Sequence, residues 1–227
     1  LRRSERLSAA GQLAAGLAHE IRNPLASITG AAGILKRGHA SPENSLECLE
    51  IIEKETDRLN RLLSSFLAFA RPRPPKLQCV DVRSLIDSVL ALAQHRREAG
   101  NAQLVADISP MLPEIEADPE QLKQVLLNLL INAIQASPPN AVVQVTASAD
   151  NSQISISVID EGCGIPPAEL GRVFEPFFTT KDEGTGLGLA IAATIVEQHN
   201  GLLSVEPNNG PGMCFRVALP LRKPATA

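Results

Sequence analysis

The sequence predicts a multi-domain protein in which an all-α antiparallel helical hairpin is followed by an α+β sandwich. Three observations indicate this fold class: two long segments with apolar residues at helical spacing, a proline-rich stretch after them, and a remainder in which helix-like and strand-like patterns mix. We therefore assign residues 1–70 to the hairpin, 71–76 to a linker and 77–227 to the second domain.

The hairpin begins with a pattern that predicts one amphipathic helix over about residues 3–37. Pro24 lies inside this helix and should kink it, because proline removes a backbone donor and crowds the preceding turn. Residues 38–40 interrupt the pattern. Ser41-Pro42-Glu43 then supplies the cap, the first-turn proline and the acidic residue that start a new helix.

The second helix carries an apolar stripe close to the heptad period between Leu46 and Ala70. One hairpin cannot bury the stripes of both helices by itself. Pairing of two copies into a four-helix bundle would cover them. We therefore expect a homodimer formed through the hairpin.

Three prolines among residues 71–76 predict a semi-rigid linker. In the second domain, helices are predicted over 82–99, 118–136 and 187–199, and strands over 103–108, 142–147, 154–159, 202–205 and 214–219. This order predicts helices on one face of a mixed sheet.

The composition excludes some classes of function. The net charge is −4 and the pI is about 5.6, and both Trp and Tyr are absent, so no nucleic-acid partner is expected. The four cysteines form no CxxC pair and predict reduced cytosolic thiols. The sequence shows no signal peptide and no membrane span, and it starts within a helical pattern, as an excised fragment would. We expect a cytoplasmic location, with membrane attachment only through segments outside this chain.

The first chemical motif, on the long helix, is His19-Glu20-Ile21-Arg22-Asn23-Pro24-Leu25. A neutral ring nitrogen of His19 can attack phosphorus near neutral pH, and Glu20 can accept its proton or fix its tautomer. Asn23 lies four residues on and shares the face of His19. A lone helical histidine is more often a surface residue. A zinc-protease HExxH motif is excluded, because position 23 is Asn.

Two further motifs lie in the second domain, one on a predicted helix and one directly after a predicted strand. Asn128 and Asn132 lie four residues apart on a predicted helix, where they could approach hydrated Mg²⁺ or simply line a solvated face. Asp160 follows an apolar strand and could accept a hydrogen bond from a base amino group. Gly162 and Gly164 permit close backbone approach, although a plain glycine turn also explains them.

A glycine-rich loop, residues 184–188, leads into a predicted helix and offers backbone N–H groups to phosphates. It is not a Walker A loop, because no Gly-Lys-Ser/Thr follows, and kinase HRD and DFG signatures are absent. Half of the phenylalanines fall within residues 174–178, where they could anchor a lid or fill the core. Lys181 could reach a phosphate or remain a solvated lysine.

Together and in this order, the motifs resemble those of the sensor histidine kinase family. Residues 19–25 resemble its H-box, 128–132 its N-box, 160–164 its first glycine box, 174–178 its F-box and 184–188 its second glycine box. Residues 210–215 loosely resemble a third glycine turn, with Met213 where Thr is often found. The resemblance covers about residues 5–220, and its details are most similar to the nitrogen-regulation type.

The resemblance implies a dimerisation and histidine-phosphotransfer hairpin followed by an ATP-binding domain of Bergerat (GHKL) type. It implies a protein histidine kinase that autophosphorylates from ATP and passes the phosphoryl group to an aspartate of a response regulator. It also implies phosphatase activity toward the phosphorylated regulator. ATP and Mg²⁺ are the implied cofactors.

The same resemblance assigns roles to residues. His19 is the implied phosphoacceptor, Glu20 its acid/base partner, and Asn23 the residue that positions water for dephosphorylating the regulator. Asn132 is the implied Mg²⁺ ligand and Asp160 the implied adenine contact. The other implied ATP-binding residues are Asn128, Gly162, Gly164, Phe174, Thr180, Lys181, Gly184, Thr185, Gly186, Leu187 and Gly188.

Three other interpretations compete with this one. A stand-alone ATPase of the same nucleotide fold would have a catalytic Glu near the start of the N-box helix, where this chain has Asn128. An anti-sigma serine kinase would lack the hairpin with its histidine. A silent scaffold would not need Asn132, Asp160 and the glycine loops. Whether transfer occurs within one chain or across the dimer depends on the turn at residues 38–42 and stays open.

Overall fold

The chain forms two compact units, one helical and one mixed. The computed structural model describes residues 3–37, 41–95, 102–181 and 184–221. The first unit comprises residues 1–72 and 176–187, and the second comprises residues 73–175 and 188–227. The predicted order, a helical part followed by a sheet domain, is confirmed.

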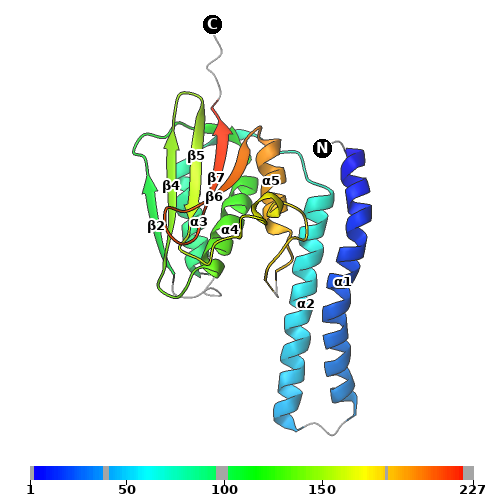
Figure 1. Ribbon diagram of the computed structural model, residues 1–227. Coiled ribbons are helices and arrows are strands. Elements are labelled where there is room, and N and C mark those ends of the chain that lie inside the picture. The colour runs from blue at the N-terminus through cyan, green and yellow to red at the C-terminus, as the bar shows by residue number, and fades with distance from the viewer. Residues whose placement is uncertain (1–2, 38–40, 96–101, 182–183, 222–227) are drawn as a thin grey trace. The chain divides into compact units, whose positions relative to one another are not determined.

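The first unit is built on a hairpin of two long helices, α1 (Arg3–Lys36) and α2 (Pro42–Ala70), which pack against each other (Figure 1). Both predicted helices are confirmed, and α1 continues through Pro24. Ser41 caps α2 as predicted, because its Oγ accepts a hydrogen bond from the Asn44 N–H at 3.2 Å. The predicted turn at residues 38–40 lies outside the described residues.

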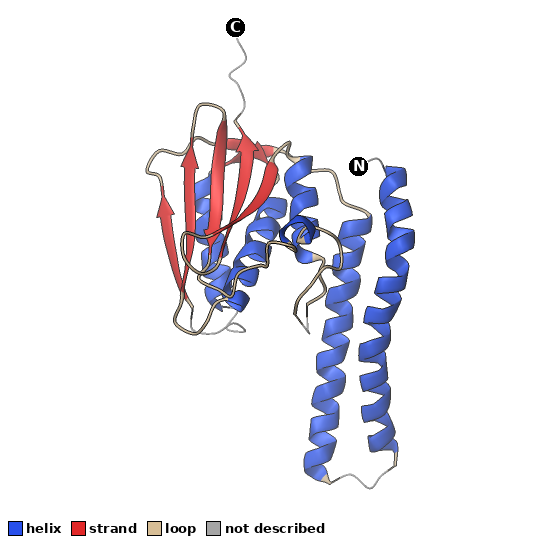
Figure 2. Cartoon of the chain, viewed as in Figure 1, coloured by secondary structure: helices blue, strands red, loops and turns tan. Residues whose placement is uncertain are grey.

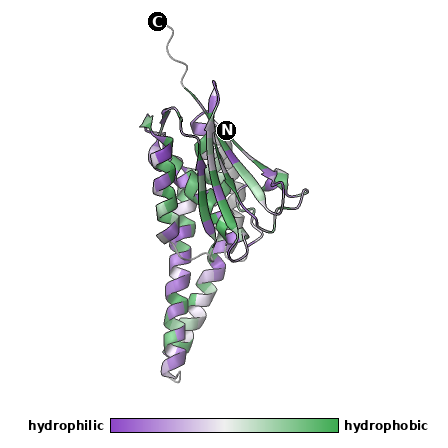
Figure 3. Ribbon diagram, turned by 90° about the vertical axis from the view of Figure 1, so that its left-hand side faces the viewer, coloured by the Kyte–Doolittle hydropathy of each residue, from purple (hydrophilic) through white to green (hydrophobic). Residues whose placement is uncertain are grey.

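Hydrophilic and hydrophobic residues alternate along the hairpin helices (Figure 3). The side chains that α1 and α2 bury include Ala31, Cys48 and Leu62. Other apolar side chains of α2 stay exposed, and Leu46 and Leu67 keep 62% and 60% of their surface accessible. A single hairpin therefore leaves apolar surface of α2 uncovered.

The second unit is a five-stranded sheet with three helices on one face (Figures 1 and 2). In sheet order the strands are β2 (Gln103–Ile108), β4 (Val142–Ala149), β5 (Gln153–Ile159), β7 (Met213–Pro220) and β6 (Leu202–Pro207). The helices are α3 (Val82–His95), α4 (Pro119–Ala136) and α5 (Gly188–Gln198). β2 pairs with β4 in parallel and the other pairs are antiparallel, which confirms the mixed sheet.

Some predicted bounds and elements differ from the structure. α3 is described to His95, and its predicted extension over 96–99 lies outside the described residues. Two short strands, β1 (Gln78–Val80) and β3 (Ile115–Ala117), pair antiparallel, and a 3-10 turn, η1, spans Leu170–Arg172. Sequence analysis missed these three elements because segments of three residues are too short to show a periodicity.

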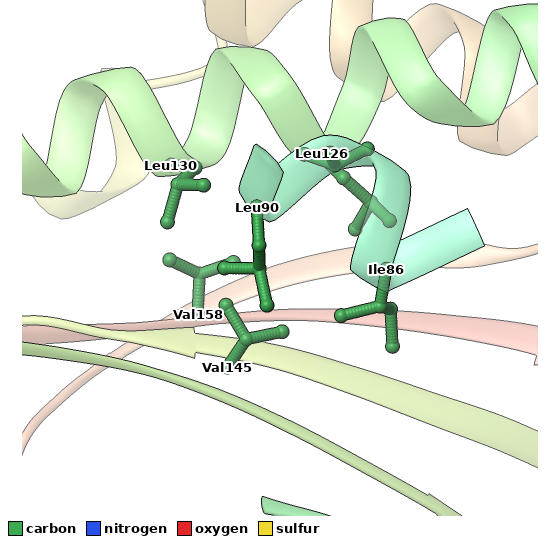
Figure 4. A pocket seen from close by; sticks show the side chains of 7 residues that line it. Ile86, Leu90, Leu126, Leu130, Val145 and Val158 are labelled. Atoms are coloured by element: carbon green, nitrogen blue, oxygen red, sulfur yellow. The ribbon is translucent and has the colours of Figure 1, made fainter. Parts of the chain in front are cut away.

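The core of the second unit lies between α3, α4 and the sheet. Seven apolar residues there, of which Figure 4 labels six, surround a cavity of about 10 Å³: Ile86, Val89, Leu90, Leu126, Leu130, Val145 and Val158. A space of that size with an apolar lining holds at most a single water and is not a ligand pocket. These residues therefore pack α3 and α4 against the sheet, and the polar residues of α4 are not among those that line the cavity.

The cysteines and the helices agree with the composition in two respects. All four cysteines are described, and none of them forms a disulfide. Within the described ranges, no helix combines the length and apolar character that a bilayer crossing needs.

Candidate active site

Asp160 is a buried polar residue of the second unit and follows directly after β5. Its side chain is buried, and the residue is only 2% exposed. The Oδ1 atom accepts hydrogen bonds from the N–H of Gly162 at 2.8 Å and of Met213 at 3.2 Å. A buried carboxylate fixed by two backbone donors presents its oxygens in one orientation, which suits recognition of a donor on a ligand.

The first glycine box packs on the last turn of α4. A Cβ on Gly162 would lie 2.6 Å from the carbonyl oxygen of Ala136, and the N–H of Cys163 donates to that same oxygen at 3.3 Å. Gly164 has a φ of +73°, a conformation that favours glycine. The predicted close approach and unusual dihedral are both confirmed.

The glycine turn before β7 closes over Asp160 from the other side. Gly212 has a φ of +94°, and a Cβ there would lie 2.0 Å from the backbone oxygen of Asp160. The Nδ2 of Asn208 donates to the backbone oxygens of Asp160 and of Pro211, both at 3.2 Å. Sequence analysis noted the glycines but missed Asn208, whose place before Gly-Pro-Gly is typical of a residue that fixes a turn.

Helix α4 joins this region to the start of α5. The Nδ2 of Asn128 donates to the backbone oxygen of Gly188 at 3.0 Å, so the amide of Asn128 binds the first residue of α5. Asn132 lies one turn later on α4 and is half-buried. Asp160, Gly162, Asn128 and Gly188 are thus connected through one helix.

The segment with the other predicted phosphate-binding residues belongs to the first unit. The N–H of Phe177 donates to the oxygen of Gly186 at 3.0 Å, and a Cβ on Gly186 would lie 2.4 Å from the carbonyl carbon of Phe177. Phe177 itself has a φ of +64°, which is rare for a bulky residue and is a strained conformation found at functional sites. The F-box and the second glycine box are therefore held together by backbone contact.

Polar contacts order the rest of this segment. The Oγ1 of Thr179 accepts the N–H of Lys181 at 3.1 Å, and the Oγ1 of Thr185 accepts the N–H of Leu187 at 3.4 Å. Thr180 is exposed, while Phe174 and Lys181 are half-buried.

The predicted H-box lies on α1 of the hairpin. His19 is within the helix, and its side chain lies outside what the structure describes. The Oε2 of Glu20 is 3.9 Å from the Nη2 of Arg58 on α2, an ion pair across the hairpin. Asn23 is exposed.

Comparison with known proteins decides the family. Residues 9–75 match the His Kinase A (phospho-acceptor) domain, and residues 117–223 match the Histidine kinase-, DNA gyrase B-, and HSP90-like ATPase. A structure of the mycobacterial sensor histidine kinase MprB is 33% identical, with a TM-score of 0.57, over 63% of this chain and 97% of that chain. The chain belongs to the sensor histidine kinase family.

Other histidine kinases match nearly the whole chain. Sensor histidine kinase ZraS of Escherichia coli (strain K12) is 45% identical over 97% of this chain and 48% of its own length. Signal transduction histidine-protein kinase AtoS of the same strain is 40% identical over 96% and 36%. The histidine kinase ThkA, solved in complex with the response regulator protein TrrA, has a TM-score of 0.84 and 31% identity over 100% of this chain and 66% of that chain. The chain thus spans about half the length of ZraS.

These matches confirm the family resemblance and the predicted fold class, a helical hairpin followed by an α+β sandwich of Bergerat (GHKL) type. Within the described ranges, no group of three or more His, Cys, Asp or Glu side chains is arranged to hold a metal ion. Asn132, a carboxamide, remains the predicted Mg²⁺ ligand of this histidine kinase core.

Sequence analysis missed a buried polar cluster at the first turn of α4. Asp118 was predicted only as the start of the helix. Its Oδ1 accepts the N–H groups of Glu120 and Gln121, both at 3.1 Å, and its Oδ2 accepts the N–H of Lys76 at 2.9 Å. Burial raises the pKa of Asp118, but these N–H groups and the nearby Arg73 outweigh it and hold the pKa below its usual 3.8.

The ionised form of Asp118 should therefore stabilise the folded histidine kinase core. Because the pKa is lower in the folded state, this contribution is present above pH 3.8 and is lost as the pH falls through 3.8 toward the folded pKa. We expect Asp118→Asn, which keeps a capping oxygen, to lower the free energy of unfolding by about 1–3 kcal/mol at pH 7. Urea unfolding followed by circular dichroism at pH 7, 5 and 3.5 measures the difference. A difference that stays constant over this range would contradict the assignment.

Proposed function

We propose that this chain is a kinase core that autophosphorylates His19 from ATP and transfers the phosphoryl group to an aspartate of a separate response regulator. The observation that carries the proposal is the buried, doubly held Asp160 in the ATPase-like domain of a chain that also bears an H-box histidine. The family match over both domains supports it.

In the proposed nucleotide site, Asp160 accepts a hydrogen bond from the adenine amino group. Because neither Gly162 nor Gly212 has a side chain, the backbones of Ala136 and Asp160 can pack closely around this carboxylate. The backbone N–H groups of residues 184–188 and the N-terminus of α5 would bind the phosphates, with Thr180 and Lys181 beside them.

Asn132 fits Mg²⁺ chemically, since its carboxamide oxygen is a hard ligand of the kind this ion prefers, beside phosphate oxygens. Bound Mg²⁺ would neutralise charge on the triphosphate. Asn128 has a different proposed part: its bond to Gly188 ties the start of α5 to α4.

In the proposed transfer, a neutral ring nitrogen of His19 attacks the γ-phosphorus in line and the bond to the β–γ bridging oxygen breaks, which releases ADP. Glu20 accepts the proton that the ring loses. Arg58 of α2 lies 3.9 Å from the Oε2 of Glu20 and would help to hold this carboxyl group beside the histidine. The N–P bond of the phosphohistidine then breaks as the phosphoryl group passes to a carboxylate oxygen of the regulator. Glu20 returns its proton to the ring, which regenerates neutral His19.

A response regulator is the proposed partner because the similar kinase ThkA has been solved in complex with one. We further propose that this core acts in the cytoplasm, where its substrate ATP is available, and that any membrane attachment uses parts of the protein outside this chain. The unpaired state of all four cysteines is consistent with a reducing compartment.

Incubation of the chain with Mg²⁺ and ATP labelled at the γ-phosphate tests the proposal. The protein should become labelled, and the label should be lost in acid and stable in alkali, because the bond is a phosphoramidate. Label that survives acid and is lost in alkali would instead identify a phosphoserine, and the histidine kinase proposal would fail.

Substitution of Asn23 by Ala should impair dephosphorylation of the regulator about tenfold or more and autophosphorylation much less. Asn23 is exposed one turn after His19, and a carboxamide can orient water but cannot act as the base for transfer from ATP. The two rates are measured with labelled ATP and with pre-phosphorylated regulator. Because Asn23 precedes Pro24, circular dichroism should verify that the helix is intact. Equal loss of both activities in a folded variant would make Asn23 structural.

We also propose that the chain is a homodimer through the hairpin. Leu46, Leu49, Leu63 and Leu67 occupy a- and d-type positions of one heptad pattern on α2, and each is between 43% and 62% exposed in the single chain. An apolar seam of this kind is covered when two hairpins form a four-helix bundle.

Sedimentation equilibrium of the full chain should give about twice its mass of 24.2 kDa. Replacing Leu63 and Leu67 together by Glu should shift the chain to the monomer mass, because charges in the seam would lose their water. Leu202→Glu is the matched control, since Leu202 is 66% exposed but lies on β6. A wild-type chain that sediments at 24.2 kDa would refute the dimer.

A further inference from the structure

Buried polar residues gather at the first turn of α4, away from the residues assigned to the nucleotide. Among the described residues, five polar or charged side chains are buried, and three of them form this cluster: Asp118, Gln121 and His199. Burying such groups is unfavourable unless each has a partner. A helix cap alone does not require it, because the exposed Ser41 caps α2 with one hydrogen bond. The cluster therefore needs another explanation.

The cluster binds residues 73–76, the segment that leads into the second unit. The Oδ2 of Asp118 accepts the N–H of Lys76 at 2.9 Å, and the Nη2 of Arg73 lies 3.5 Å from the Oδ1 of Asp118. The Nε2 of Gln121 donates to the backbone oxygen of Arg73 at 3.0 Å. Residues 73–76 are thus bonded at both ends to α4. The linker predicted over 71–76 is fixed to the second unit from Arg73 onward.

The same turn of α4 is also tied to α5. The N–H of Asp118 donates to the Nε2 of His199 at 3.0 Å, and the Nδ1 of His199 lies 2.8 Å from the oxygen of Ile195. These partners assign the neutral tautomer with its proton on Nδ1. At the other end of α5, the backbone oxygen of Gly188 accepts a hydrogen bond from the side-chain amide of Asn128. The antiparallel pair α4 and α5 is therefore clamped at two levels, one at the linker and one at the glycine box.

We infer that Asp118, Gln121 and Arg73 form a latch that fastens residues 73–76 to α4. The two domains then pivot at Arg71–Pro72. Movement of the linker is transmitted to α4, the helix that carries Asn128 and Asn132. Only Arg71 and Pro72 separate the end of α2 from the first latched residue. These three are positioning residues. The effect on phosphoryl transfer rests on the proposed function, whereas the latch itself does not.

The test uses variants that open the latch and leave the Asp118 cap in place. Arg73→Ala removes the guanidinium, and Gln121→Met removes the amide donor at nearly constant volume. Arg71→Ala is the matched control, since it is also an exposed arginine, two residues earlier, and its backbone N–H bonds to Leu67 of α2. Arg73→Lys should restore part of the function, because it keeps a positive charge near Asp118.

Two readouts on the full chain decide the outcome. Hydrogen exchange at the Lys76 amide should become about tenfold faster in both latch variants and remain unchanged in Arg71→Ala. The autophosphorylation rate at saturating Mg²⁺-ATP should fall about threefold to tenfold, while the dissociation constant for ATP changes less than about twofold.

Unchanged exchange at Lys76 would show that no latch exists. Faster exchange with an unchanged rate would show that the latch transmits nothing to the site, and the inference would be wrong. An equal loss of ATP affinity and rate would mean that these residues only maintain the pocket, which also overturns it. If the wild-type chain does not phosphorylate itself, the proposed function fails, and exchange at Lys76 still tests the latch.

Discussion

Replacing His19 by Gln should abolish incorporation of phosphate from ATP, by about a thousandfold or more, while leaving ATP affinity unchanged. Glutamine is a good helix former of similar reach, so α1 should stay intact. Its amide nitrogen is not nucleophilic, because its lone pair is delocalised into the carbonyl. The variant therefore removes the chemistry and retains the helix.

The measurement pairs two assays on the same sample. Labelling with γ-labelled ATP reports the transfer, and titration with a fluorescent ATP analogue reports ATP affinity. Circular dichroism controls for the helix content of the hairpin. Continued incorporation of acid-labile label by the His19→Gln chain would show that another residue accepts the phosphoryl group.

The sequence was most informative where a pattern is long or a motif is local. The helices α1 and α2 follow from apolar spacing sustained over many turns, and β2 has the predicted bounds Gln103–Ile108. The glycine boxes are also visible in the sequence, because a backbone that packs closely against another requires glycine. Gly162, which packs against Ala136, is an example.

The parts that sequence analysis missed depend on partners far apart in the chain. Asp118 was visible as a helix start, but Lys76 is 42 residues and His199 is 81 residues away from it in sequence. No periodicity or spacing connects such positions, and only the packing of α4 against α5 and the linker brings them together. The positive φ of Phe177 was not predicted either, because a bulky residue rarely adopts it and no local sequence signal marks it.

The burial of Asp160 could be predicted only in part. Its place after an apolar strand indicated a contact with a base. Its carboxylate is fixed by the N–H groups of Gly162 and of Met213, the first residue of β7, and Asn208 in the turn before β7 holds the Asp160 backbone. The role of the residue was therefore suggested by the motif, whereas the rigidity of the site is a property of the fold.

Substitution of Asp160 by Asn should weaken ATP binding by about tenfold to a hundredfold, which corresponds to about 1–3 kcal/mol. An Asn side chain retains one oxygen that can accept the N–H groups of Gly162 and Met213, so the local turn should persist. Its other atom is an NH₂ donor, which faces the adenine amino group unfavourably. Competition with GTP should become stronger relative to ATP, because the NH₂ can donate to the oxygen that guanine has in place of the amino group.

Asp150→Asn is the matched control for this substitution. The Oδ1 of Asp150 likewise accepts two backbone N–H groups, those of Ser152 at 2.7 Å and Gln153 at 2.9 Å, but it lies exposed in the turn between β4 and β5. Titration with the fluorescent ATP analogue, with GTP as competitor, should separate the two variants, and urea unfolding should show both folded. If Asp160→Asn binds ATP as tightly as Asp150→Asn does, the carboxylate does not contact adenine. The base would then have to bind at another part of the domain.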